Sequence, residues 1–129
     1  MNKNISKSDK VVIYQSKSGA IELRGDINKE TIWASQAQIA ELFDSERSVI
    51  TKHIRNILND KELDEESVCA NFAHTADDGK KYRVKYYNLD VILSVGYRTN
   101  SVTAIKFRKW TTKTLHSADI RLDDHSIDT

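Results

Sequence analysis

Apolar side chains recur at helical spacing in two adjacent stretches of the chain, separated by about one turn of polar residues. In the first stretch, Ile39, Leu42 and Phe43 fall on one side of a helix that Ser35 can cap at its N-terminus. After the interruption at residues 44–46, four aliphatic residues form one stripe on a second helix: Ile50, Ile54, Ile57 and Leu58. The pattern predicts two packed helices joined by a tight turn.

The other side of the second helix carries hydroxyl, cationic and amide groups at steps of three and four residues. They are Ser48, Thr51, Lys52, Arg55 and Asn59. Such groups reach phosphate oxygens and the edges of base pairs, so the pair of helices resembles a helix-turn-helix. A purely structural helical hairpin has the same two faces, and Asp44 and Ser45 stand where helix-turn-helix units usually have glycine and an aliphatic residue. The pair alone leaves both interpretations open.

Strand-like patterns lie on both sides of this unit. Upstream, residues 11–15 and 20–23 predict a hairpin, and a short strand around residues 31–33 leads into the first helix, with Trp33 as a core anchor. Downstream, residues 68–75 and 81–88 are two runs separated by Asp78-Gly79, a strong signal for a hairpin turn.

Alternation along the second downstream run gives the hairpin a basic face. Tyr82, Val84 and Tyr86 are predicted to point one way, and the opposite side holds Arg83, Lys85 and Tyr87. A hairpin that follows a helix-turn-helix makes the unit winged, and its cations can then lie along a phosphate backbone. The alternative is a set of solubilising charges on the outer face of a packed hairpin.

Two helices are predicted to close the domain. Asn88 can cap a helix over residues 89–97, with Leu89, Ile92, Leu93 and Gly96 on its buried face. Ser101 can cap a last helix that ends near Leu115, with Phe107 and Trp110 in the core. The predicted fold is α+β, a winged helix-turn-helix with an N-terminal β-hairpin and two C-terminal helices. We expect a flexible tail at residues 1–10, one domain at 11–115, and an acidic, disordered tail at 116–129.

Composition places the chain among ordinary globular proteins, with 39% hydrophobic and 30% charged residues. No apolar run approaches the roughly 20 residues that span a bilayer, and the polar N-terminus lacks the apolar stretch of a signal peptide, so we expect a cytoplasmic protein. The single cysteine, Cys69, fits a reducing compartment and is read as a small core residue rather than a nucleophile.

The net charge of +1 hides a strong asymmetry along the chain. Residues 44–79 contain five more acids than bases, whereas residues 80–113 contain eight more bases than acids. The bases of this block are Lys80, Lys81, Arg83, Lys85, Arg98, Lys106, Arg108, Lys109 and Lys113. A one-sided block of this kind is typical of a surface that contacts phosphate.

No catalytic or metal-binding pattern stands out in the sequence. The histidines, His53, His74, His116 and His125, have no metal-ligand spacing, and the glycines form no phosphate-binding loop. Asp77-Asp78 is read as a turn rather than a metal-binding pair. We therefore expect no enzymatic activity, no cofactor, no metal and no small-molecule substrate.

With these residues in view, the chain resembles the virulence-associated RhuM family of bacterial proteins. The matching stretches are VVIYQSKSGAIEL, TIWASQAQIAELFDSERSVITKHIRNIL, ELDEESV, DDGKKYRVKYYNLDVILSVGYRTNS and KFRKWTTKTL. The family is similar in layout to phage antirepressor-type and winged-helix modules, and its members are often found in mobile or pathogenicity regions. The resemblance implies a DNA-binding domain of the transcription-regulator type. Family members commonly continue past the KFRKW helix, whereas this chain turns acidic after Leu115.

The expected function is sequence-specific binding of double-stranded DNA. Five residues of the second helix are expected in the major groove: Arg47, Ser48, Thr51, Lys52 and Arg55. Four hairpin residues, Lys80, Lys81, Arg83 and Lys85, are expected on phosphates, where Gln36 can also donate. The sequence allows a homodimer, because one small recognition unit rarely gives enough specificity. Two alternatives stay open: a protein-interaction domain on the same scaffold, and a truncated family member that lacks the active region.

Overall fold

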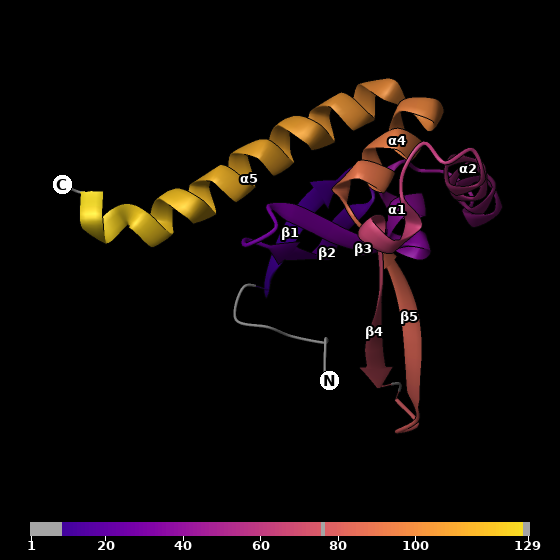
Figure 1. Cartoon of the computed structure of the whole chain (residues 1–129), viewed down its shortest axis with the longest axis horizontal. Helices are drawn as coiled ribbons and strands as arrows, with labels where there is room; N and C mark the ends of the chain where they lie inside the picture. Colours follow the sequence, from indigo (N-terminus) through magenta and orange to yellow (C-terminus); the bar gives the residue numbers. More distant parts are fainter. Residues whose placement is uncertain (1–8, 76, 128–129) are drawn as a thin grey trace.

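The computed structural model describes residues 9–75 and 77–127, and side chains at residues 10–73 and 77–116. Three strands are followed by three helices, two strands and two further helices (Figure 1). Their bounds are β1 Asp9–Ser16, β2 Gly19–Asp26, β3 Thr31–Ser35, α1 Gln36–Leu42, α2 Arg47–Asn59, α3 Glu65–Val68, β4 Cys69–Thr75, β5 Lys81–Tyr87, α4 Leu89–Thr99 and α5 Ser101–Ile127. The predicted α+β class is confirmed.

The five described strands form one antiparallel sheet in the order β1-β2-β3-β5-β4. Residues 9–16 pair with residues 19–26 without interruption, which confirms the first hairpin. The short strand β3 pairs with β2 on one side and, through Ala34 and Ser35, with β5 on the other. The sequence predicted two separate hairpins, but β3 joins them into a single sheet.

The predicted pair of helices is α1 and α2, and a capping box fixes where α1 begins. The Ser35 hydroxyl accepts a hydrogen bond from the Gln38 N–H at 3.3 Å, and the Gln38 side chain accepts one from the Ser35 N–H at 3.0 Å. Two N–H groups that would lack partners at the start of a helix are thereby satisfied. Because Ser35 is also the last residue of β3, the sheet directly sets the origin of α1.

A left-handed residue ends α1 and turns the chain into α2. Asp44 has φ of 51°, and its N–H donates to the Glu41 carbonyl at 3.3 Å while the Ser45 N–H donates to the Ala40 carbonyl at 3.0 Å. These two bonds make a Schellman motif, which usually places glycine at the left-handed position. Aspartate is among the few other residues that tolerate this conformation, so the departure from glycine does not prevent the turn.

One apolar core lies between the inner face of the sheet and the helices. Phe107 of α5 is fully buried, and its ring meets the Tyr14 ring of β1 edge-on at 5.0 Å between centroids. Gly96 of α4 lies where a Cβ would overlap the ring of Phe43 and come within 2.9 Å of the Ala104 Cβ. A glycine at this position therefore lets α4 approach α5 and the α1–α2 turn closely.

The cap of α4 is as predicted, but its buried face is wider. The Asn88 Oδ1 accepts hydrogen bonds from the N–H groups of Asp90 and Val91 at 3.1 and 3.3 Å. Leu89 and Leu93, which were predicted on the buried face, are only half-buried. The buried residues are Val91, Ile92, Val95 and Gly96. The difference arises because α4 contacts α2, β3 and α5 together, so that more than one stripe is enclosed.

Both ends of α5 differ from the prediction. Asn100 rather than Ser101 caps its start, since the Asn100 Oδ1 accepts from the Thr103 N–H at 3.2 Å. The helix continues to Ile127 instead of ending near Leu115, because residues 101–127 contain neither glycine nor proline to stop it. The division of residues 116–129 as a separate acidic tail stays a prediction.

Smaller differences occur elsewhere. The expected N-terminal tail lies outside the described residues except for its last two, which belong to β1. Residues 60–64 connect α2 to the short helix α3, which the sequence did not predict. In the part of the chain that the structure describes, no helix has the length and apolar character needed to cross a membrane.

Candidate nucleic-acid interface

The outward side of α2 is a row of exposed polar and cationic side chains. Ile50, Ile54 and Ile57 are buried against the core, as the helical stripe predicted. The opposite side holds four residues that are exposed to solvent: Arg47, Ser48, Lys52 and Arg55. Thr51, which the sequence placed in the same set, is half-buried. The row is therefore available to a ligand except at its centre.

A chain of hydrogen bonds ties α2 to α1 and to the β4–β5 hairpin. The Thr51 hydroxyl donates to the Gln36 Oε1 at 2.8 Å, and the Gln36 Nε2 donates to the Tyr87 Oη at 3.3 Å. The Thr51 hydroxyl also lies 2.9 Å from the Arg47 carbonyl oxygen. Gln36 was predicted as a phosphate donor, but its amide atoms are engaged inside the protein. This bridge holds the outer row of α2 in a fixed place relative to the root of the hairpin.

Aromatic rings clamp the root of the hairpin to the sheet. Phe72 of β4 meets Trp33 of β3 edge-on at 6.0 Å and Tyr86 of β5 at 5.1 Å between ring centroids. The Arg24 guanidinium of β2 stacks over the Phe72 ring, 4.2 Å from its centroid. Edge-on rings and a cation over a ring face are both favourable arrangements. Trp33 is buried, so its predicted role as a core anchor is confirmed.

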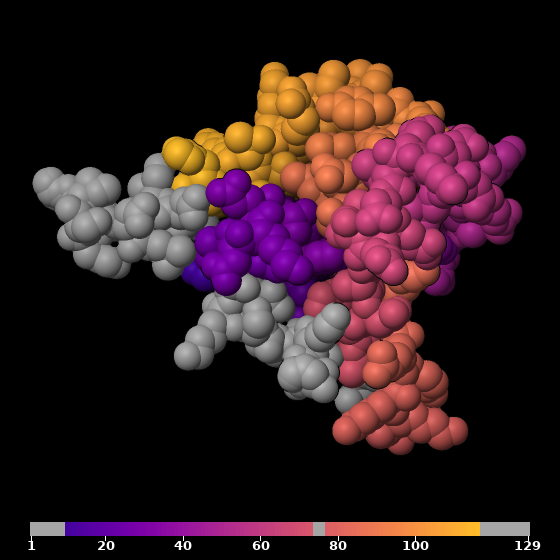
Figure 2. All heavy atoms as spheres, viewed as in Figure 1, coloured from indigo at the N-terminus to yellow at the C-terminus, as the bar shows by residue number. Residues whose placement is uncertain are grey.

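The tip of the hairpin has the predicted turn. Gly79 has φ of 85°, a conformation that glycine adopts without strain, and the Lys80 N–H donates to the Asp78 Oδ1 at 2.9 Å. Lys80 and Lys81 beside the turn are exposed, as is Arg83 on β5. Figure 2 shows the hairpin as a protrusion from the body of the molecule, so these cations can reach a partner of considerable size.

The fourth predicted hairpin cation is already paired. The Lys85 Nζ lies 3.1 Å from the Glu65 Oε2 of α3, and both side chains are substantially exposed. The hydrogen bond to Glu65 raises the pKa of Lys85 above its usual value. An exposed pair of this kind adds little stability, so a phosphate can compete with Glu65 for the lysine.

Cys69 lies near this ion pair, at the start of β4. Its side chain is half-buried and packs against the core. Burial raises the pKa of the thiol, which keeps it protonated near neutral pH. The interpretation of Cys69 as a small apolar residue agrees with this environment.

One predicted orientation in the hairpin is wrong. Tyr87 was placed with Arg83 and Lys85 on an outward basic face, yet its side chain is only 4% exposed. The reason is the pairing of Ala34 with Tyr87, because β3 and α1 cover the end of β5. The alternation of the strand was correct, but nothing in the sequence indicated that β3 would pair with the end of β5.

The two groups of candidate residues lie at one end of the molecule. Figure 1 shows α2 and the β4–β5 hairpin at the end away from the C-terminus of α5. The rest of the basic block is elsewhere: Arg98 on α4 forms an ion pair with Glu62, and α5 exposes Lys106, Arg108, Lys109 and Lys113. The sequence block of residues 80–113 is thus divided among the hairpin, α4 and α5.

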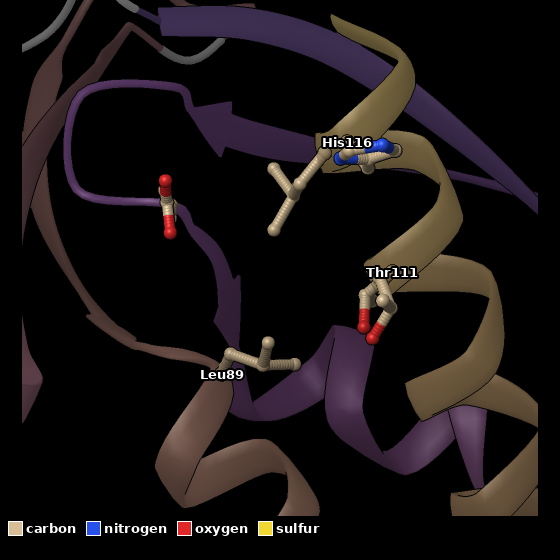
Figure 3. A pocket seen from close by; sticks show the side chains of 6 residues that line it. Leu89, Thr111 and His116 are labelled. Atoms are coloured by element: carbon tan, nitrogen blue, oxygen red, sulfur yellow. The ribbon is translucent and has the colours of Figure 1, made fainter. Parts of the chain in front are cut away.

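A cavity of about 280 Å³ lies away from this end, between the β2–β3 turn, the start of α4 and the middle of α5. Figure 3 shows Leu89, Thr111 and His116 around it. Thr111 is fully buried, and its hydroxyl donates to the Arg108 carbonyl at 2.9 Å. This cavity shares no residue with the candidate interface.

Comparison with known proteins finds one family. The model of the Virulence protein RhuM family matches residues 67–125, which contain β4, β5, α4 and most of α5. No curated protein matches the chain, and no solved structure does. The match includes the hairpin cations and does not extend to α1 and α2.

Proposed function

We propose that this chain, whose residues 67–125 match the model of the Virulence protein RhuM family, binds double-stranded DNA sequence-specifically, as a transcription regulator does. In this proposal α1 and α2 are the helix-turn-helix, and the β4–β5 hairpin is its wing. The observation that carries the proposal is the exposed row on α2, held beside the wing by the bridge of Thr51, Gln36 and Tyr87.

The size of α2 suits a duplex groove. A helix with its side chains is about 10–12 Å across, and the major groove is about 12 Å wide, so it admits one α-helix. Arg47 and Arg55 are about 12 Å apart along the helix axis. Either guanidinium can donate two hydrogen bonds to the O6 and N7 atoms of guanine, while Ser48 and Lys52 between them can reach bases or phosphates.

The wing supplies phosphate contacts in this proposal. Lys80, Lys81 and Arg83 are exposed, and Lys85 joins them when phosphate displaces Glu65. Such contacts carry little sequence information, but they set the position of the protein on the duplex. Binding should therefore weaken steeply with salt, in proportion to the number of phosphates that are neutralised.

Thr51 and Gln36 act as positioning residues rather than contacts. Their side chains are engaged with each other and with Tyr87, so they fix the angle between α2 and the wing. Because α2 and the wing are held at a fixed angle, the contacts to the major groove and to the DNA phosphates can form together. Binding then does not require a further loss of conformational entropy in the protein.

The test begins with selection of bound duplexes from a random pool, followed by fluorescence anisotropy on a selected site over a range of salt concentrations. Arg47→Ala and Arg55→Ala are expected to weaken binding to that site by about 1–3 kcal/mol each, because a bidentate guanine contact is worth that much. The matched controls are the single variants Lys109→Ala and Lys113→Ala, each of which also removes one cation, in this case from α5.

Two outcomes would overturn the proposal. One is the absence of any complex at low salt and micromolar protein. The other is an equal loss of affinity in the α5 controls and the α2 variants, since that would place the contact surface elsewhere.

A further inference from the structure

We propose that the free edge of β1 pairs with β1 of a second copy of this chain, so that the sheet continues across a two-fold homodimer. This surface shares no residue with the proposed DNA interface. The inference therefore concerns assembly and stands on different observations.

The first observation is the edge itself. Among the described strands, β1 pairs with β2 alone, and its other side ends the sheet. It is eight residues long, its register with β2 has no bulge, and residues 11–16 contain neither a charge nor a proline. Bulges, charges, prolines and short length are the devices that keep edge strands from pairing, and β1 has none of them in this stretch.

The second observation is exposed apolar surface on the same strand. Val11 and Ile13 are 70% and 56% exposed. Both side chains are β-branched, and they are neighbours on the outer face of the strand because they lie two residues apart. The other edge strand of the sheet, β4, differs in this respect, because the exposed residues among 69–73, where its side chains are described, are Asn71 and Ala73. Exposed hydrophobic side chains on an unpaired edge strand indicate a surface that is stabilised when another strand covers it.

The apolar side chains on the inner face of β1 are also incompletely buried. Val12 and Tyr14 point toward the core but are only half-buried, as is Trp110 of α5, whose ring lies 5.0 Å from that of Tyr14. A strand added beside β1 would cover these side chains on one face while covering Ile13 on the other. Both faces of the edge would therefore lose exposed apolar area.

The sequence of β1 suits pairing with itself. In an antiparallel register centred on Ile13, Ile13 faces Ile13 of the second copy, and Val12 faces Tyr14. Lys10 falls opposite Ser16, and the position opposite Lys17 is residue 9, an aspartate. Like charges directly opposite destabilise a strand pair and opposite charges stabilise it, so the ends of this register are electrostatically compatible. A two-fold interface requires such self-complementarity.

The experiment is sedimentation equilibrium of the full chain without DNA, so that its outcome does not depend on the proposed function. We expect a concentration-dependent dimer that Ile13→Lys converts to a monomer, since the change sets two like charges at the two-fold axis. The control is Val102→Lys on α5, a residue that is 63% exposed and outside β1, and it should keep the dimer. Thermal unfolding of both variants by circular dichroism checks that each is folded.

Cross-linking gives a second readout. In a Cys69→Ser background, Ile13→Cys should be joined into a covalent dimer by a short bismaleimide, and Val102→Cys should not. A monomeric unmodified chain at the highest soluble concentration would overturn the proposal. So would a dimer that survives Ile13→Lys, or one that is lost only when Ala73→Lys changes the β4 edge.

Discussion

Gly96 offers a sharp test of how α4, α5 and the α1–α2 turn pack together. An alanine Cβ at this position would overlap the Cζ atom of Phe43, lie 2.7 Å from its Cε1 atom and lie 2.9 Å from the Ala104 Cβ. Separations below 3.0 Å are essentially never seen for real Cβ atoms, so the neighbours must move. Both Phe43 and Ala104 are buried, so neither can swing toward solvent.

Two effects of opposite sign set the expected magnitude for Gly96→Ala. Alanine gains about 1 kcal/mol over glycine in a helix interior. Overpacking a close-packed core typically costs about 1–3 kcal/mol, and overlap with two buried groups argues for the upper part of that range. The free energy of unfolding should therefore fall by about 1–2 kcal/mol.

Urea unfolding followed by circular dichroism measures this change, with the slope checked for two-state behaviour. Ser94→Ala on the same helix is a suitable control, because it raises helix propensity by about 0.5 kcal/mol without this overlap. A second comparison uses the Phe43→Leu background, where the ring edge is absent and Gly96→Ala should cost less. Stabilisation by about 1 kcal/mol, as at an open helical site, would refute the close approach, and so would an equal cost in both backgrounds.

Three further predictions concern single side chains. Gln36→Ala removes the partner of Thr51 and Tyr87, and should lower the free energy of unfolding by about 1–2 kcal/mol in urea titrations; an unchanged value would mean that the bridge does not hold α2. Asn88→Ala removes the cap of α4 and should cost about 1 kcal/mol, whereas Asn88→Asp, which keeps the acceptor, should cost less. Because burial raises the pKa of the Cys69 thiol, its reaction with a disulfide reagent should begin at higher pH in the folded chain than in urea, and coincident pH profiles would contradict this.

Local signals along the chain were sufficient to predict most elements. The structure confirms Ser35 and Asn88 as helix N-caps and Asp78-Gly79 as a hairpin turn. Each of these signals acts through backbone groups within a few residues, so the sequence alone is enough to recognise it. The turn at Asp44 was harder to predict, since aspartate only tolerates the conformation that glycine prefers. The stop of α5 was misjudged for a related reason: loss of apolar periodicity does not end a helix in the absence of a breaking residue.

The candidate interface was predicted less completely than the fold. Exposure of Arg47 and Arg55 follows from helical periodicity, which the sequence displays. The internal engagement of Gln36 and the burial of Tyr87 depend on contacts between residues about fifty positions apart. Periodicity reports which face of an element is polar, but it does not report which polar groups find partners across the fold.

The double pairing of β3 bears on how this protein can be divided. The segment that matches the family, residues 67–125, begins after β3, although β5 needs β3 as a neighbour. A fragment that begins at residue 67 would lack β3 and α1. One edge of β5 would then have no strand to pair with, and Tyr87 would lose its contacts with Ala34 and Gln36. The segment that the family model matches thus contains only part of the sheet, and any excised version should retain the chain from β1 onward.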